Sequence, residues 1–445
     1  MSGQLTQSVS TVGAVRERLG NLGPTWVASA IAAGPATLAS LITAGATYGY
    51  TLLWVVVLSA IAGTFAQYLS TQLGIHADGG IVRLVERRLG RHWSWLLVID
   101  GVLAAGLAQL VIMKTVADVS AMITGIDARL WGVAWAILLA VGLAGGGYRF
   151  AERGAKLLVS LVVLAFLASV FVVPVNLGAA VGGLVPVIPA GTSGALLAAG
   201  ILGGAVHITL VTMQTYTVRA RGWTSDADAR VAVVDIVSSM LIAFGVYSLA
   251  IFLVAGSVLH TPSVNAGSLT ATAAAQALGP LAGPYAKWLF LLGLWGAAVS
   301  TLGGNTVAPP YLIADAFGWE TDVSDARYRA VLTVVALLSA GGAFLGGSFF
   351  PLLVLVLAFG LVGTPFALAL VLYLLNDQAI LNRRPSTAMN AGGLLLIGVT
   401  TLTAGSFVDS HLTGTLTPLD AFVDIFAIIL AGAMLLLALR YARHE

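Results

Sequence analysis

The sequence of 445 residues contains no cysteine and very little charge. The absence of cysteine excludes disulfide bonds, thiolate metal ligands and thiol redox chemistry. Charged residues make up 9% of the chain and hydrophobic residues 58%, whereas about a quarter of an average soluble domain is charged. Together with a mean hydropathy of +0.97, this composition indicates an integral membrane protein.

Long apolar runs predict about twelve membrane-spanning helices. A helix needs about 20 residues to cross the roughly 30 Å hydrocarbon core, and the alternation typical of outer-membrane strands is absent. The predicted spans are residues 24–46, 50–73, 95–123, 130–147, 156–177, 195–218, 231–258, 285–307, 329–348, 350–375, 391–407 and 418–440. The connections are short, and we expect no attached soluble domain.

The positive charges predict the orientation of these spans. If the N-terminus is cytoplasmic, all of the 21 Lys and Arg residues except Lys114, Arg129 and Lys287 lie on the cytoplasmic side, as the positive-inside rule requires. We therefore expect a multi-pass protein of the cytoplasmic (inner) membrane with both termini in the cytoplasm. The first 21 residues, which include Arg16 and Arg18, lack the apolar region of a signal peptide. The net charge of +2 thus reflects membrane topology and gives no indication of nucleic-acid binding.

Two of the predicted spans are interrupted near their centres. Span one contains Gly34-Pro35, and span six contains Gly203-Gly204. Interrupted spans five apart are typical of an inverted repeat of five plus five helices that holds its substrate at the midplane. We expect non-helical backbone at residues 34–36 and 203–206. The alternative is a tolerated kink in span one and a close helix contact in span six.

Polar groups beside the two interruptions predict a binding site. The half-helix that begins near Ala36 directs free N–H groups and its positive end toward the midplane, which suits a carboxylate or another anion. Each hydroxyl also has a structural alternative, a hydrogen bond to the backbone of its own helix. The predicted substrate-binding residues are Gly34, Ala36, Thr37, Ser40, Gly203, Gly204, His207, Thr209 and Thr212.

One stretch of the sequence resembles a known transporter family. The pattern AGA-x-YGY-x-LLW is matched from Ala44 to Trp54, and the pattern Q-x-LS-x-x-LGI is matched from Gln67 to Ile75. These residues are similar to the first two helices of the Nramp family of proton-coupled divalent-metal transporters. Weaker similarity continues through KTVADVSAMITG, VRARGW, AAVSTLGGN and TPFALAL in spans three, six, eight and ten.

The resemblance implies an all-α membrane protein of the LeuT fold. Such a protein has a 5+5 inverted repeat of transmembrane helices, here with about two extra helices, and its helices 1 and 6 are broken at mid-membrane. The expected organisation is a cytoplasmic arm at 1–21, helices 1–5 at 22–180, helices 6–10 at 190–376, helices 11–12 at 389–440 and a cytoplasmic tail at 441–445.

The metal-binding motifs of the family do not carry over. The family breaks its first helix at Asp-Pro-Gly-Asn, and the matching residues here are Gly34, Pro35, Ala36 and Thr37. The family's Met-Pro-His in helix 6 is matched by His207, Ile208 and Thr209, or its histidine alone by His207 after a one-residue gap. The methionine is missing in either register. Because a divalent ion prefers anionic or strongly dipolar ligands, the usual manganese or iron site is not expected.

Charged and hydroxyl residues in two other spans are candidates for ion coupling. Asp118 matches the acidic residue of the family's proton path, and Lys114 lies four residues before it on the same helix face. The two residues form either a structural ion pair or a proton relay. Ser300 and Thr301 resemble the hydroxyl pair of a sodium site in related folds. Asp100 and Asp235 are expected at the membrane interface.

These observations leave three functional hypotheses. The favoured one is a secondary transporter, coupled to H⁺ or Na⁺, of a small polar organic solute, with carboxylate-bearing solutes among the candidates. The second is a divalent cation transporter (Mg²⁺ or Mn²⁺) with a remodelled site, in which His207 is a possible metal ligand. The third is a non-transporting receptor on the same scaffold. No cofactor is expected, and no nucleophile, base and orienting group recur at a spacing typical of an enzyme.

Overall fold

The computed structural model describes residues 23–145, 148–190, 192–261, 268–381, 385–412 and 418–443. Within these ranges every regular element is a helix, and no strand occurs. The predicted arm at 1–21 and residues 444–445 of the predicted tail lie outside the described ranges.

Helices occupy every predicted span. The helices that form them are α2 (Pro24–Ala32), α3 (Pro35–Tyr48), α4 (Leu53–His76), α6 (Arg91–Thr124), α7 (Ala128–Gly145), α8 (Tyr148–Val172), α10 (Thr192–Val206), α11 (Ile208–Ala220), α12 (Asp226–Ile236), η1 (Val237–Phe244), α13 (Gly245–Val258), α16 (Ala286–Thr306), α18 (Ala326–Leu338), η4 (Ser339–Phe344), α19 (Phe349–Asn376), α20 (Thr387–Leu412) and α21 (Pro418–Arg443). Eight stretches in the described ranges are long and apolar enough to cross a membrane by length and composition, and α7 and α8 contain two shorter apolar helices.

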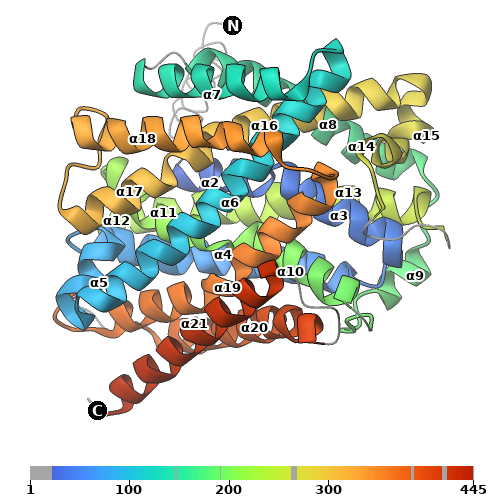
Figure 1. The fold of residues 1–445 in the computed structure, drawn as a ribbon. Helices are drawn as coiled ribbons and strands as arrows, with labels where there is room; N and C mark the ends of the chain where they lie inside the picture. Colours follow the sequence, from blue (N-terminus) through green and yellow to red (C-terminus); the bar gives the residue numbers. More distant parts are fainter. Residues whose placement is uncertain are drawn as a thin grey trace, which may run out of the picture.

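Short helices connect these spans. They are α5 (Ile81–Leu89), α9 (Leu177–Gly182), α14 (Ala271–Ala274), η2 (Ala275–Leu278), α15 (Gly279–Ala282), η3 (Gly283–Tyr285) and α17 (Ala308–Phe317). Helices α5, α12 and α17 gather at one end of the bundle, whereas α9 and α15 lie at the other (Figure 1).

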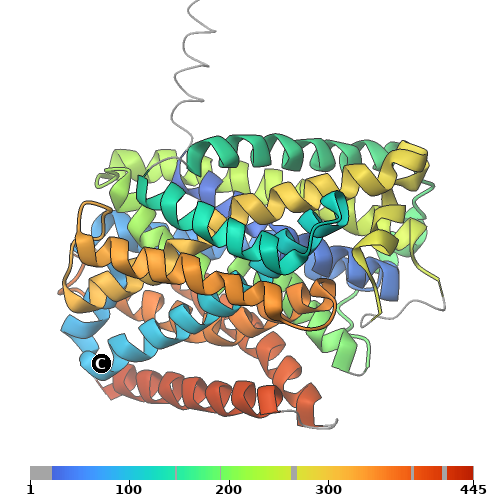
Figure 2. The ribbon, with the colours of Figure 1, turned by 45° about the horizontal axis from the view of Figure 1, so that its top comes forward.

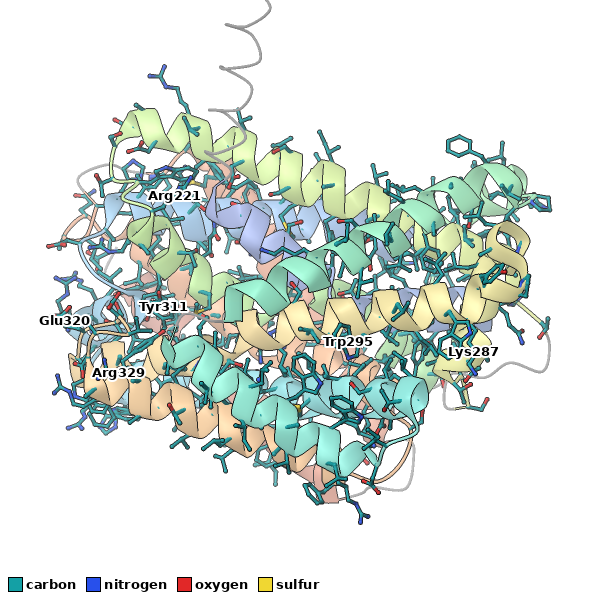
Figure 3. All side chains as sticks on the ribbon, turned by 90° about the horizontal axis from the view of Figure 1, so that it is seen from above. Arg221, Lys287, Trp295, Tyr311, Glu320 and Arg329 are labelled. Atoms are coloured by element: carbon teal, nitrogen blue, oxygen red, sulfur yellow. The ribbon has the colours of Figure 1, made fainter. Side chains whose placement is uncertain are left out.

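The two ends of the bundle differ in charge. Arg221 and Arg329 lie at the end that carries α5, and Lys287 lies at the opposite end (Figure 3). We call the first of these the arginine-rich end. A separation of this kind is what the positive-inside rule requires of a protein with two aqueous faces, and the assignment of the arginine-rich end to the cytoplasm stays a prediction.

The broken spans lie in the interior of the bundle. In the most apolar stretch of α10 and α11, 94% of the residues are buried inside the protein, and in that of α19 the buried share is 83%. The corresponding share for α20 and α21 is 33%, and both helices lie at the edge of the bundle (Figure 2). The spans that carry the predicted site are therefore enclosed by protein, while α20 and α21 are left to face lipid.

Glycine permits several helices to approach closely, and the contact of α16 with α8 provides a test. A Cβ atom at Gly293 of α16 would lie 2.6 Å from Val162 Cγ1 and overlap the Val162 side chain. We expect Gly293→Ala to lower the free energy of unfolding by about 1–3 kcal/mol, because overpacking forces the helices apart. The measurement is thermal unfolding of the purified protein in detergent.

The control for this prediction is Gly106→Ala, because a Cβ atom at Gly106 of α6 would meet nothing within 4 Å. Addition of Val162→Gly to Gly293→Ala should recover part of the lost stability, because it removes the Val162 Cβ atom that the new methyl group would overlap. Unchanged unfolding of the Gly293→Ala protein would contradict the described contact between α8 and α16.

Candidate transport site

The first break lies between α2 and α3 at Ala33 and Gly34, so the prediction of non-helical backbone at 34–36 holds for Gly34 and is wrong for Pro35 and Ala36, which begin α3. Helix α2 ends at Ala32, and α3 begins at Pro35, whose missing N–H and fixed φ suit the first position of a helix. The Thr37 hydroxyl donates a hydrogen bond to the Ala32 carbonyl, and the Gly34 N–H donates to the Ile31 carbonyl at 3.0 Å. These bonds satisfy the end of α2 and hold the two half-helices together.

The second break lies at His207, so the prediction of non-helical backbone at 203–206 is wrong. Gly203 and Gly204 are helical residues of α10. Their small size serves packing, because a Cβ atom at Gly203 would overlap the Leu357 carbonyl of α19. A Cβ atom at Gly204 would lie 2.5 Å from Thr37 Oγ1. The glycine pair thus brings α10 against α19 and α3, and the helix continues to Val206.

His207 forms the second break and caps the helix that follows it. Its backbone is extended, and its Nδ1 accepts a hydrogen bond from the Thr209 N–H at 3.3 Å and also bonds the Thr209 hydroxyl. A neutral imidazole that accepts at Nδ1 carries its proton on Nε2. Nε2 lies against Gly360 of α19, where a Cβ atom would overlap the ring, and the ring also has a hydrogen bond to the Val356 backbone of the same helix. Direct contact of His207 with a substrate stays a prediction.

A cavity of about 40 Å³ lies between the two breaks. Of the residues predicted to bind substrate, six line it: Gly34, Ala36, Thr37, Gly204, His207 and Thr209. Thr301 of the predicted sodium site also lines the cavity, and its buried hydroxyl has no partner among the described residues.

Four predicted residues do not line the cavity. The Ser40 hydroxyl donates to the Ala36 carbonyl at 2.9 Å, and the Thr212 hydroxyl donates to the Ile208 carbonyl at 3.0 Å. These are bonds within their own helices, the structural alternative that the sequence left open. Gly203 faces α19, and Ser300 does not contribute to the lining.

Residues that sequence reasoning did not predict complete the cavity. They are Ile31, Ala32, Pro35, Ala108, Ile112, Leu210, Asn305, Val356 and Leu357. The Asn305 Nδ2 group donates to the Ala105 carbonyl at 2.8 Å and to Gln109 Oε1 at 3.0 Å. These bonds fix the side chain through its nitrogen and leave Oδ1 as an acceptor. An amide in each of two apolar spans, Gln109 and Asn305, was the sequence signal for this contact.

The helix ends at the cavity differ in which backbone N–H and carbonyl groups they leave without a partner. The first helical residue of α3 is Pro35, which has no N–H, and the N-terminus of α11 is capped by His207. At the end of α10 the last four carbonyl groups, those of residues 203–206, have no partner within the helix. Only the Val206 carbonyl accepts a side-chain bond that the structure shows, from Thr364 at 2.7 Å. Two helix ends of opposite sign therefore meet at the cavity: the negative end of α10 and the positive end of α3, which has no side-chain cap and contributes Ala36 and Thr37 to the lining.

Asp100 and Asp235, which the sequence predicts at the membrane interface, are both buried inside the protein, and their depth in the membrane stays a prediction. Asp235 is 7% exposed and accepts hydrogen bonds from the Gly23 N–H at 2.8 Å and the Thr25 N–H at 3.0 Å. It thereby caps the first turn of α2. Asp100 is 1% exposed and lies against Gly363 of α19.

Lys114 and Asp118 form an ion pair away from the cavity. Lys114 Nζ lies 3.0 Å from Asp118 Oδ2 and donates to the Leu345 carbonyl at 2.8 Å. Neither residue lines the cavity. These contacts favour the structural pair over the proton relay.

This pair predicts a non-additive response to substitution. Asp118→Asn should lower the free energy of unfolding by about 1–3 kcal/mol, because it leaves a buried ammonium group with only neutral oxygen atoms as partners. Lys114→Met combined with Asp118→Asn should be more stable than Asp118→Asn alone, since no buried charge is then unpaired. Thermal unfolding of the two singly substituted proteins and the doubly substituted protein gives the comparison. A relay would instead appear as a double variant that folds normally and no longer transports.

The chain has known relatives in sequence over most of its length. The sequence profile of the natural resistance-associated macrophage protein-like (Nramp) family matches residues 25–409. A divalent metal cation transporter MntH of Deinococcus radiodurans is 30% identical over 312 residues, 67% of this chain and 70% of that protein. The MntH of Mycobacterium tuberculosis is 27% identical over 389 residues, 82% of this chain and 86% of that protein.

Solved structures share the fold. A manganese transporter of Eremococcus coleocola superimposes with a TM-score of 0.68 at 16% identity, over 93% of this chain and 92% of its own. Mhp1, a nucleobase-cation-symport-1 family transporter, superimposes with a TM-score of 0.55 at 17% identity, over 91% of this chain and 96% of its own. The architecture is that of the LeuT-like transporters, with both broken helices in the interior.

Proposed function

We propose that this chain, which belongs to the natural resistance-associated macrophage protein-like (Nramp) family of transporters, carries a divalent cation that keeps part of its water shell. Its relatives in two bacteria are named divalent metal cation transporters. The favoured hypothesis from the sequence, an organic solute, receives no support from these relatives, and the alternative of a remodelled cation site fits them better.

The main support for this proposal is the small volume of the cavity. Pockets for small organic molecules span roughly 300–1,000 Å³, whereas the space between the breaks is about 40 Å³. A water molecule needs roughly 10–15 Å³ measured in this way. The cavity therefore suits an ion with one or two waters and is much too small for an amino acid or a similar solute.

The end of α10 also supports a cation as the cargo. A cation needs oxygen atoms at the negative end of a helix, and α10 ends at the cavity with Gly204 in its lining.

The available oxygens are neutral, which favours a hard cation with retained water. We assign the direct contacts to Thr301 Oγ1, Asn305 Oδ1 and the Gly204 carbonyl, all from residues that line the cavity. The described ranges contain no group of three His, Cys, Asp or Glu side chains that could hold a metal. Mg²⁺ commonly keeps several waters and uses few protein ligands, so this donor set suits Mg²⁺ better than a soft transition metal.

The Thr301 hydroxyl takes the space of the lost family carboxylate. A Cβ atom at Gly34 would lie 2.7 Å from Thr301 Oγ1 and 2.8 Å from the Ile31 carbonyl. Any side chain at position 34 would therefore need Thr301 to move. In this chain the oxygen at that place belongs to α16 and is neutral, so the site is rebuilt around a different helix.

The test is cation binding by the purified protein, measured by calorimetry with Mg²⁺ and with Mn²⁺. We expect saturable Mg²⁺ binding, and we expect Thr301→Val and Asn305→Leu each to weaken it about tenfold, the effect of losing roughly 1.4 kcal/mol. Thr301→Ser should retain affinity because it keeps the hydroxyl. The matched control is Thr400→Val, which removes a buried hydroxyl of α20 that donates to the Leu396 carbonyl.

Two results would contradict this proposal. One is binding of a small carboxylate by a protein that binds neither cation. The other is tight Mn²⁺ binding that His207→Ala abolishes and Thr301→Val leaves unchanged, which would move the site to the imidazole. Uptake of the bound cation into proteoliposomes separates a transporter from a receptor on the same scaffold.

A further inference from the structure

A groove lies between the last three helices, on the side of the bundle that is left to face lipid. Its volume is about 320 Å³, and its walls belong to α19, α20 and α21. Each helix contributes residues about one turn apart, such as Leu394 and Ile397 of α20 and Leu437 and Tyr441 of α21. Leu394 is 63% exposed and Tyr441 is 42% exposed, so the groove opens at the edge of the bundle, where α20 and α21 lie (Figure 2).

The walls of this groove are mainly apolar. Leu372, Ile397, Met434 and Leu437 are among the lining residues. A buried water molecule needs about two to four polar partners, and these side chains offer none. A hydrocarbon chain has no polar group to satisfy and is as apolar as a leucine side chain. In a bilayer the groove therefore suits an acyl chain.

The volume of the groove limits what else could fill it. An α-helix with its side chains is about 10 Å across, so three turns of a helix occupy on the order of 1,000 Å³. That is about three times the volume of the groove. A helix of a second copy of the chain does not fit, whereas part of a single acyl chain does.

A pair of amides lies at one end of the groove. Asn376 Nδ2 donates to Asn390 Oδ1 at 2.9 Å and to the Leu372 carbonyl at 2.9 Å, and Asn390 Nδ2 donates to Asn376 Oδ1 at 2.8 Å. A side-chain amide carries two N–H groups, so Asn390 keeps one N–H without a partner in the described part of the chain. The glycerol esters of a phospholipid have carbonyl oxygens that accept such a bond.

Arg440 lies at the same end of the groove. It follows Leu437 by three residues and directly precedes Tyr441, both of which line the groove. Its Nη2 group donates to the Arg88 carbonyl at 3.2 Å, and no ion pair to Arg440 occurs among the described residues. The carboxylate of Asp377 is already paired with the Arg88 guanidinium, whose Nη2 donates to Asp377 Oδ1 at 2.9 Å. These three side chains leave one positive charge without a carboxylate.

We propose that the groove between α19, α20 and α21 binds an anionic phospholipid. One acyl chain lies in the groove, and the phosphate of the headgroup binds the Arg440 guanidinium through charge-assisted hydrogen bonds. The position suits a headgroup, because Arg440 contacts α5 and thus lies at the arginine-rich end of the bundle (Figure 1). The bound lipid joins α20 and α21 to α19, the helix that contributes Val356 and Leu357 to the cavity between the breaks.

The experiment measures the first lipid to bind the purified protein by native mass spectrometry. The probes are dioleoylphosphatidylglycerol, which is anionic, and dioleoylphosphatidylcholine, which is zwitterionic. We expect the wild type to bind phosphatidylglycerol about fivefold more tightly, the contribution of one arginine near a membrane surface. Arg440→Gln should remove this preference and leave the affinity for phosphatidylcholine unchanged, whereas Arg440→Lys should keep the preference.

The matched control for the charge is Arg329→Gln. Arg329 also lies at the arginine-rich end and donates to backbone carbonyl groups (Figure 3). It belongs to α18, which does not line the groove. We expect Arg329→Gln to keep the wild-type preference for phosphatidylglycerol.

A second pair of variants tests the groove itself. Ala438 lines the groove, and Ala438→Trp should weaken the first binding step of both lipids about tenfold, because the indole takes the place of methylene groups of the acyl chain. Leu439→Trp puts the same side chain on α21 at a position outside the lining and should behave as the wild type.

Three results would overturn the proposal. They are equal affinity of the wild type for the two lipids, a preference that Arg440→Gln leaves intact, and lipid binding that Ala438→Trp does not weaken. A dimer in the same spectra that Ala438→Trp dissociates would also overturn it, because the groove would then belong to an interface with a second copy. No readout involves a cation, so these results do not depend on the proposed cargo.

Discussion

The close approach of α19 to three other helices is the constraint on which the site depends. Gly203 of α10, and Gly360 and Gly363 of α19, each occupy a place where a Cβ atom would overlap a neighbour. Through these contacts α10, the His207 ring and the Asp100 carboxyl all reach the same surface of α19. Since packed interiors tolerate even one added methyl group poorly, glycine at these positions determines both the width of the cavity and the isolation of the carboxyl group.

The two breaks differ in how the polar groups at their helix ends are satisfied. Helix α2 is satisfied at both ends, by Asp235 at its start and by bonds from Gly34 and Thr37 at its finish. Helix α10 ends beside the cavity, and its residue Gly204 is part of the lining. In the proposed cation site, this helix end and the side chains of α16 supply neutral oxygens in place of a negatively charged ligand.

Much of the fold could be predicted from the sequence, because span length, apolar composition and the match at Ala44–Trp54 each indicate it directly. The break at Gly34 was also predictable, since a proline removes a backbone donor within an apolar run. The second break was placed too early, because glycine pairs serve close packing as well as chain reversal, and only the neighbouring helix decides between them. The burial of Asp100 inside the protein could not be predicted, because the glycine against which it packs is 263 residues away in the sequence.

The neutral lining of the cavity has a consequence for the energetics of the proposed cation transport. No Asp or Glu lines the cavity, so no side chain of the lining carries a charge that would compensate a bound dication. The membrane voltage would then perform work on every cycle, about 2.3 kcal/mol per elementary charge for each 100 mV. A binding site made of neutral oxygens would thereby make the proposed transport electrogenic.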